Sequence, residues 1–278
     1  MEFKSKLSIG TVQFGLNYGI SNKHGQTTSD EVTKILNLAL DQGIDMLDTA
    51  AAYGNAEKVL GENNLEGFRI VSKFMPPLKE EKIINQLYKS LENLRVNSLF
   101  GYLAHRPLNV VDNPGQWEEL IKLRESGLIE KIGFSLNEPS ELDELFNKDF
   151  IPDLIQVPFN YFDTRFEKKL IDIKKWRCEI HARSVFLQGL FFANMKVLPS
   201  FFDEVKPLIK SLQESITFLS GSLLRFALEQ PLIDKVIIGL GNSSQLLLNI
   251  ENIEKSTMLP KLTKTISESI IIPSKWPK

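Results

Sequence analysis

Four polar side chains in the first half of the chain have the types needed for acid–base chemistry: Asp48, Tyr53, Lys73 and His105. A free phenol is a weak acid at neutral pH, with a pKa of about 10, and a nearby ammonium lowers such a pKa because it stabilises the phenolate. Lys73 can supply that ammonium, and Asp48 can keep it charged and oriented. With His105 donating to a carbonyl oxygen or relaying a proton, the group is suited to protonating an oxygen while a hydride arrives at the adjoining carbon.

Each of these residues also has an ordinary structural interpretation. An aspartate at a strand end commonly caps the next helix, and a tyrosine in the following loop commonly packs at the rim. A lysine at a strand end is usually a solvated or paired surface charge. A histidine before Arg-Pro is as common in a simple turn as in an active site. What favours chemistry is that all four stand at three consecutive strand ends, where barrel enzymes place their catalytic groups.

The strands that must position these residues are short apolar runs bounded by polar residues or glycine. Longer amphipathic segments separate the runs, and this alternation predicts a parallel sheet. Eight such units favour a closed (β/α)8 TIM barrel, one domain over residues 1–278, over an open doubly wound sheet. The open sheet would call for a G-x-G-x-x-G turn, and GTVQFGLNYG lacks that spacing. The expected strands are 6–11, 44–49, 68–74, 99–105, 129–135, 153–159, 179–186 and 235–241.

The intervals between the strands carry helix signatures. In the segment 28–43, Thr28 and Glu31 are spaced as a capping box, and Gly43 ends the apolar periodicity. The other expected helical segments are 79–94, 115–127, 139–148, 165–176, 207–230 and 243–256.

Composition excludes several classes of function. A formal net charge of −2 argues against a nucleic-acid partner, which usually requires a concentrated basic surface. No apolar run approaches the ~18 residues of a membrane span, and the start of the chain lacks the shape of a signal peptide. Cys178 is the only cysteine, and the three histidines lie far apart, so we expect no disulfide and no metal. A cytoplasmic protein fits these features best.

Several motifs together make the chain similar to the aldo-keto reductases, in particular to a small bacterial branch of that family. The resemblance implies a (β/α)8 barrel that reduces aldehydes or ketones with a hydride from NADPH and with Tyr53 as general acid. Asp48, Tyr53, Lys73 and His105 match the family's catalytic tetrad. The motifs are GTVQFG at 10–15, DTAAAYG at 48–54, VSK at 71–73, HRP at 105–107, IGFS at 132–135, IQVPFN at 155–160 and IIGLGNSSQLLLNI at 237–250.

The resemblance also implies a cofactor site. Ser135 and Gln156 would hold the nicotinamide carboxamide, the segment 184–190 the pyrophosphate, and the segment 239–249 the adenosine. The complete expected set is Gly10, Thr11, Val12, Asp48, Ser135, Gln156, Arg183, Ser184, Gln188, Gly189, Leu190, Gly239, Gly241, Asn242, Gln245 and Asn249.

Three departures from the family pattern bear on the cofactor. Leu136 follows Ser135 where the family often has a second carboxamide ligand, and Asn137 comes one residue later. Arg183 stands where an aromatic ring usually stacks on the nicotinamide, and its charge would favour the reduced cofactor if no acid neutralises it. The loop 239–245 has no basic residue for a 2′-phosphate, so NADPH is the first expectation and NADH remains possible.

The expected partner is a small carbonyl substrate, and analogy with the bacterial branch suggests a keto-sugar. The chain is expected to be a monomer or a small homo-oligomer. Two other functions remain open: a non-catalytic cofactor-binding regulatory or sensor subunit, and a barrel aldolase or isomerase with Lys73 as Schiff-base amine.

Overall fold

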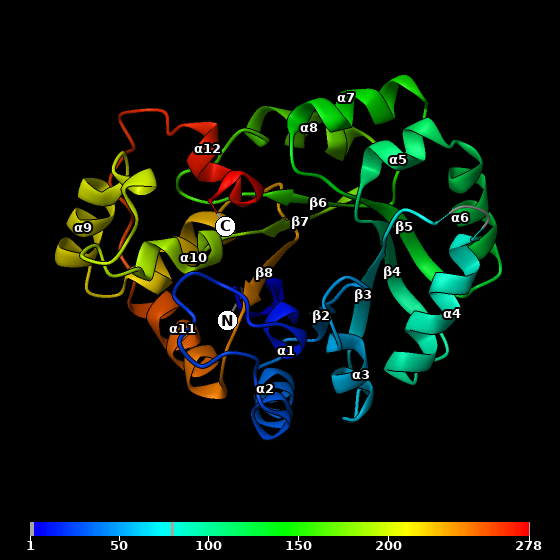
Figure 1. The fold of residues 1–278 in the computed structure, drawn as a ribbon, viewed down its shortest axis with the longest axis horizontal. Helices are drawn as coiled ribbons and strands as arrows, with labels where there is room; N and C mark the ends of the chain where they lie inside the picture. The colour runs from blue at the N-terminus through cyan, green and yellow to red at the C-terminus, as the bar shows by residue number, and fades with distance from the viewer. Residues whose placement is uncertain (1–2, 79–80, 278) are drawn as a thin grey trace.

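The eight expected strands are present, and they close into a parallel barrel in which β8 pairs with β1 (Figure 1). The computed structural model describes residues 3–78 and 81–277. The predicted fold class, a (β/α)8 barrel, is therefore confirmed. The strands are β1 (Leu7–Gly10), β2 (Met46–Asp48), β3 (Arg69–Phe74), β4 (Leu99–Ala104), β5 (Ile129–Ser135), β6 (Leu154–Pro158), β7 (Glu179–Arg183) and β8 (Lys235–Gly239).

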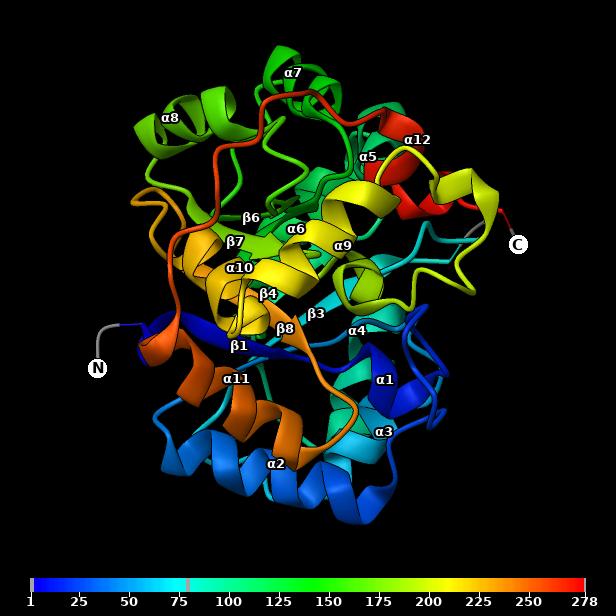
Figure 2. The ribbon, with the colours of Figure 1, turned by 90° about the vertical axis from the view of Figure 1, so that its left-hand side faces the viewer.

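Helices surround the barrel (Figures 1 and 2). The α-helices are α1 (Val12–Gly15), α2 (Ser29–Asp41), α3 (Ala56–Gly61), α4 (Ile83–Leu94), α5 (Pro107–Asp112), α6 (Gly115–Glu125), α7 (Pro139–Asn147), α8 (Glu167–Lys175), α9 (Lys206–Ser215), α10 (Leu219–Leu228), α11 (Ser243–Lys255) and α12 (Glu268–Ile271). The short 3-10 helices are η1 (Lys4–Lys6), η2 (Leu187–Phe192), η3 (Ser200–Phe202) and η4 (Pro273–Lys275).

The prediction of one helical segment over 207–230 is wrong, because this stretch forms two helices, α9 and α10. The backbone at Ile216 is extended, with φ −117° and ψ 104°. Ile216 and Thr217 are consecutive β-branched residues, which lose side-chain freedom in a helix. The Ile216 side chain is buried in an apolar cluster that also contains Leu212 and Leu219, and this burial stabilises the break.

The predicted capping box of α2 is only half formed. Thr28 accepts a hydrogen bond from the backbone N–H of Glu31 at 3.4 Å, as predicted. The Glu31 carboxylate instead accepts from Lys34 at 2.8 Å and from both the N–H and the hydroxyl of Ser243, at 2.9 and 3.0 Å. This contact joins the start of α2 to the start of α11.

The strands separate an apolar outer layer from the barrel interior. Alternate residues point outward to the helices, and their inward neighbours Met46, Val71 and Leu154 belong to a separate apolar cluster. Continuing that alternation by two residues toward the carboxyl end gives Asp48, Lys73 and Gln156. The period of the strands thus brings the polar residues to the mouth of the barrel, above an apolar interior.

The C-terminal segment after α11 covers one side of the barrel. Figure 2 shows it as the orange-to-red trace that leaves α11 and leads to α12. The Arg225 side chain donates to the carbonyl of Ser256 at 3.2 Å, and the Tyr161 hydroxyl donates to the carbonyl of Pro260 at 2.8 Å. Ile266 and Ile270 pack in the apolar cluster that contains Ile216, together with residues of η2 and α9. We call it the second apolar cluster.

Candidate active site

The side chain of Lys73 is fully buried, and all three of its donors are used. Its ammonium lies 2.8 Å from each carboxylate oxygen of Asp48 and 2.8 Å from the carbonyl oxygen of Thr49. A buried charge is costly unless it is paired and hydrogen-bonded, and both conditions are met here. Thr11 holds Asp48 from the other side, because its N–H and its hydroxyl both donate to the Asp48 carbonyl oxygen.

Tyr53 and His105 meet above this ion pair. The Lys73 ammonium lies 5.0 Å from the centroid of the Tyr53 ring. The rings of Tyr53 and His105 contact edge to face, with centroids 5.9 Å apart and an interplanar angle of 87°. The four residues that the sequence singled out therefore form one cluster at the carboxyl ends of β2, β3 and β4.

His105 is held in its neutral form. Burial, together with the charges of Lys73, Arg183 and Arg106, lowers the pKa of the imidazole from 6.5 to about 3. Its Nδ1 is buried with no hydrogen-bond partner in the part of the chain that the structure describes. At neutral pH the ring therefore carries one N–H donor and one acceptor, so it can pass a proton without itself becoming cationic.

Ser135 and Gln156 lie side by side on neighbouring strands, in register at the ends of β5 and β6. Both side chains are buried. The Gln156 amide nitrogen donates to Asp48, while the amide oxygen is buried without a partner among the described residues. An unpartnered buried acceptor beside a serine hydroxyl suits a ligand amide, which fits the carboxamide that these residues were predicted to hold.

The segment after β7 has an unusual backbone. Ser184, Leu187, Gln188 and Gly189 all have positive φ angles, of 62°, 45°, 53° and 86°. Only Gly189 adopts this conformation without strain, and a Cβ there would lie 1.9 Å from the Ser21 hydroxyl. The Leu190 side chain is buried in the second apolar cluster, so only its backbone could meet a ligand. Strain of this kind is often kept at ligand sites.

The predicted adenosine segment follows β8. Asn242 caps α11 by accepting from the N–H of Gln245 at 2.9 Å, and the Gln245 side chain accepts from the N–H of Gly241 at 2.8 Å. Gln245 and Asn249 lie on α11, on the helical layer outside the barrel, and thus apart from the tetrad. Gly239, at the end of β8, is in register with Gly10 at the end of β1, so the predicted adenosine segment begins at the barrel mouth.

At the β1 end of the site, Gly10 is also in register with Asp48. Val12 begins α1 directly after Thr11.

Arg183 ends β7 and bonds only to neutral groups. One nitrogen, Nη2, donates to the carbonyl of Leu136 at 2.6 Å and to the side-chain oxygen of Asn137 at 2.7 Å. Nη1 lies 3.3 Å from the hydroxyl of Ser184. The displacement of Asn137 by one position, noted in the sequence, thus has a structural use: its side chain holds Arg183.

Tyr18, in the loop between α1 and α2, lies near enough to Tyr53 and Arg183 for their charges to act on it, and the sequence did not single it out. Burial, reinforced by Tyr53 and opposed by Arg183, raises the pKa of the Tyr18 phenol to about 12. Its loop is tied to the segment after β7, since the N–H of Ile20 donates to the carbonyl of Gln188 at 2.9 Å. An aromatic residue shortly after a strand end, in the sequence GLNYGI, was the available signal.

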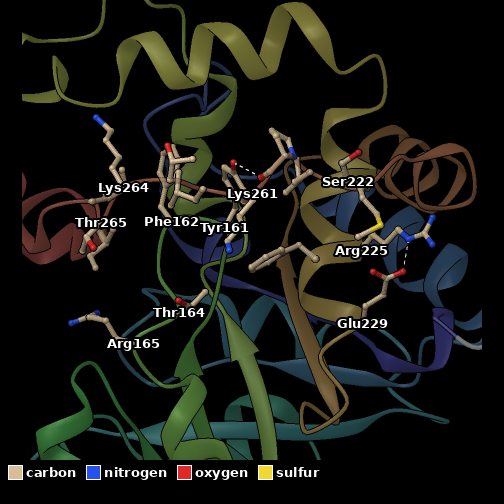
Figure 3. A pocket seen from close by; sticks show the side chains of 18 of the residues that line it. Tyr161, Phe162, Thr164, Arg165, Ser222, Arg225, Glu229, Lys261, Lys264 and Thr265 are labelled. Carbon is tan, nitrogen blue, oxygen red and sulfur yellow. Dashed lines mark hydrogen bonds and ion pairs between the residues drawn. The ribbon is translucent and has the colours of Figure 1, made fainter.

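A cavity of about 690 Å³ lies elsewhere, between the C-terminal segment and α10 (Figure 3). Tyr161, Phe226 and Lys261 are among its lining residues, and Arg225 pairs with Glu229 at its edge. None of the predicted site residues lines this cavity. It contributes no group to the acid–base cluster, which lies at the barrel mouth.

Metal sites and membrane spans also bear on function. Within residues 3–78 and 81–277, no cluster of three or more histidine, cysteine or acidic side chains has the geometry to hold a metal ion. The same part of the chain contains no helix that is long and apolar enough to cross a membrane.

The barrel and its Asp–Tyr–Lys–His cluster define the class of protein, a (β/α)8 barrel with an acid–base cluster at the carboxyl ends of its strands. The model of the Aldo/keto reductase family matches residues 6–269. The chain therefore belongs to the Aldo/keto reductase family. The predicted family is confirmed.

The individual relatives have low sequence identity to this chain. Methylglyoxal reductase DkgA of Escherichia coli (strain K12) is 31% identical over 134 residues, covering 46% of this chain and 47% of DkgA, so the match spans about half of that relative. The uncharacterized oxidoreductase YqkF of Bacillus subtilis (strain 168) is 27% identical over 278 residues, covering 88% of this chain and 90% of YqkF. The crystal structure of an aldo-keto reductase from Klebsiella pneumoniae in complex with NADPH has a TM-score of 0.67 and 19% identity, covering 92% of this chain and 87% of that chain.

Proposed function

We propose that this protein reduces a small aldehyde or ketone with NADPH and that Tyr53 is the general acid. The observation that carries the proposal is the arrangement of Tyr53 between a fully paired Lys73 ammonium and a neutral His105. Such a site supplies a proton to an oxygen at neutral pH without placing a free acid in the barrel.

Each member of the cluster has a distinct task in this proposal. Tyr53 gives its proton to the carbonyl oxygen as that oxygen becomes an alkoxide. The ammonium of Lys73 stabilises the phenolate left behind, and Asp48 keeps the ammonium fixed. His105, being neutral, can pass its N–H proton to the Tyr53 phenolate as its other ring nitrogen takes up a proton from solvent, which restores both groups for another turnover.

The cofactor part of the proposal has its own support. Ser135 and the unpartnered oxygen of Gln156 would hold the carboxamide, and the strained segment Ser184–Gly189 would follow the phosphates. When bound, NADPH supplies the hydride that reaches the carbonyl carbon. The NADPH complex of the Klebsiella pneumoniae relative supports this choice, and NADH stays possible because the loop 239–245 has no basic residue.

The substrate proposal rests on chemistry and on relatives. A mouth built from one phenol, one imidazole and a second phenol, Tyr18, suits a small polar carbonyl compound. DkgA carries the name methylglyoxal reductase, which supports a short 2-oxoaldehyde as the first substrate to test. A keto-sugar, suggested by the bacterial branch, is the second.

The two other functions considered from the sequence are less well supported. A Schiff-base enzyme needs a free amine, whereas the Lys73 ammonium is bound by three acceptors. A non-catalytic subunit has no use for an intact acid–base cluster. Borohydride trapping of Lys73 with a carbonyl substrate would favour the first of these alternatives.

The test is a panel of short aldehydes, ketones and keto-sugars, followed by the loss of NADPH or NADH absorbance. We expect turnover of at least one short 2-oxoaldehyde, with faster use of NADPH than of NADH. Tight cofactor binding without turnover of any member would instead indicate the regulatory subunit. The absence of a nucleic-acid partner, the oligomeric state and a cytoplasmic location stay predictions.

A further inference from the structure

Arg183 is placed by its strand and fixed by its bonds. It is the last residue of β7 and lies in register with Pro158, two residues after Gln156 on β6. Its guanidinium reaches across the end of β6 to Leu136 and Asn137, which follow β5. The Nε atom is buried with no partner in the part of the chain described by the structure. The group is therefore held in one orientation and cannot swing freely into solvent.

The positive charge of Arg183 has no acid partner within residues 3–78 and 81–277. The nearby acids are engaged elsewhere: Asp163 pairs with Arg165 at 2.8 Å, and the Glu141 carboxylate accepts from the backbone N–H groups of Asn137 and Glu138, at 2.6 and 3.1 Å. The three bonds that Arg183 makes go to two amide oxygens and one hydroxyl, all neutral. These bonds orient the guanidinium but leave its charge uncompensated.

This charge reaches the reacting groups. Arg183 contributes to the lowered pKa of His105, and it also acts to lower the pKa of Tyr18, against the larger effect of burial. The carbonyl that binds it belongs to Leu136, the residue directly after Ser135, one of the two candidates for holding the carboxamide. A nicotinamide that delivers hydride beside Tyr53 and His105 would lie within the field of this guanidinium.

A nicotinamide ring is neutral when reduced and gains one positive charge when oxidised. An uncompensated cation nearby disfavours the oxidised ring, and it does so more strongly inside a protein than in water. We propose that Arg183, positioned by Asn137, makes the site discriminate between the two redox states of the cofactor by repelling the oxidised form. This inference rests on the proposed function, and it makes Arg183 a specificity residue and Asn137 its positioning residue.

The decisive measurement is the Kd of three ligands, NADPH, NADP+ and 2′-phospho-ADP-ribose, by calorimetry with wild type, Arg183→Gln and Arg183→Lys. The third ligand keeps the pyrophosphate and the 2′-phosphate of the cofactor, but it has no nicotinamide. We expect Arg183→Gln to tighten NADP+ relative to NADPH by roughly tenfold. Arg183→Lys, which keeps the charge, should retain most of the wild-type ratio. Binding of 2′-phospho-ADP-ribose should not change in either variant.

Asn137→Asp gives an independent test that keeps Arg183. It places a carboxylate where a neutral oxygen now lies 2.7 Å from the guanidinium, with almost the same shape. The inference predicts that this variant also tightens NADP+ relative to NADPH, although no residue proposed to touch the cofactor has changed. A merely structural role for Asn137 would not move that ratio.

Three outcomes would overturn the inference. An unchanged NADPH-to-NADP+ ratio in both Arg183→Gln and Asn137→Asp would show that the charge does not act on the ring. Equal weakening of all three ligands in Arg183→Gln would mean that Arg183 binds the phosphates. If wild type binds neither cofactor, the proposed function itself fails and this inference falls with it, a result distinct from binding with an unchanged ratio.

Discussion

The mouth of the barrel holds two cations in opposite electrostatic situations. On the β2–β4 side, Lys73 is fully buried and bound by both oxygens of Asp48. On the β5–β7 side, Arg183 is fixed by Leu136 and Asn137 and meets no acid among the described residues. Whether a cation is paired with an acid therefore decides how its charge acts. A paired cation positions and supports its neighbour, whereas an unpaired one acts through its field on whatever binds beside it.

The largest expected effect comes from breaking the compensated pair. Lys73→Met leaves the buried Asp48 carboxylate without its cation, so the free energy of unfolding should fall by about 3–5 kcal/mol. Urea unfolding measures this loss. The control is the double variant Lys73→Met with Asp48→Asn, which removes both charges and should be more stable than the single variant. Equal stability of the two would contradict the pairing.

A smaller effect concerns the pH dependence of stability. His105 has a pKa of about 3 in the folded protein, against 6.5 ordinarily, so below pH 6.5 the unfolded chain binds a proton that the folded chain does not. The stabilisation is complete above pH 6.5 and is lost as the pH falls toward 3. Between pH 7.5 and 5.5 this loss amounts to about 1.4 kcal/mol. It should be absent from His105→Gln and retained in His24→Gln, which alters an exposed histidine.

Removing the uncompensated cation should cost little stability, in contrast with Lys73→Met. Arg183→Met loses two good hydrogen bonds but also removes a partly buried charge that has no acid partner in the described chain, and these effects oppose each other. We expect the free energy of unfolding to change by less than about 1 kcal/mol, measured as for Lys73→Met. A loss of several kcal/mol would show that Arg183 is chiefly structural.

The smallest expected effect is at the far end of the proposed cofactor site. The Glu31 carboxylate accepts from the N–H and hydroxyl of Ser243, and its hydrogen bonds to Lys34 and Ser243 lower its pKa to about 2. An anion there competes with a 2′-phosphate for the start of α11. Glu31→Gln should therefore raise the affinity for NADPH relative to NADH by about threefold. Calorimetry with both cofactors measures this, and an unchanged preference would place the 2′-phosphate elsewhere.

The sequence predicted the barrel and the meeting of the four polar side chains at its mouth because both depend on local signals. Short apolar runs bounded by polar residues mark the strands, and the polar residues at their ends identify the mouth. The break at Ile216 was missed because the helical periodicity continues across it, while tertiary packing of that side chain decides the backbone.

The roles of Asn137 and Tyr18 depend on contacts between distant parts of the chain. Asn137 follows β5 and Arg183 ends β7, so they meet across the end of β6, which lies between those two strands in the barrel. The loop of Tyr18 is tied to the segment after β7 through Ile20 and Gln188. The spacing of residues along the sequence predicts neither of these two long-range contacts, although GLNYGI does mark an aromatic residue shortly after a strand end.

The proposal that Tyr53 is the proton donor is tested most directly by single-turnover reduction with NADPH-loaded wild type and Tyr53→Phe. The variant keeps the ring that contacts His105 and lies beside Lys73, and it loses only the hydroxyl. We predict that the rate of hydride transfer falls by about a hundredfold to ten-thousandfold, while the Kd for NADPH is unchanged. Reduction by Tyr53→Phe at the wild-type rate would contradict the account.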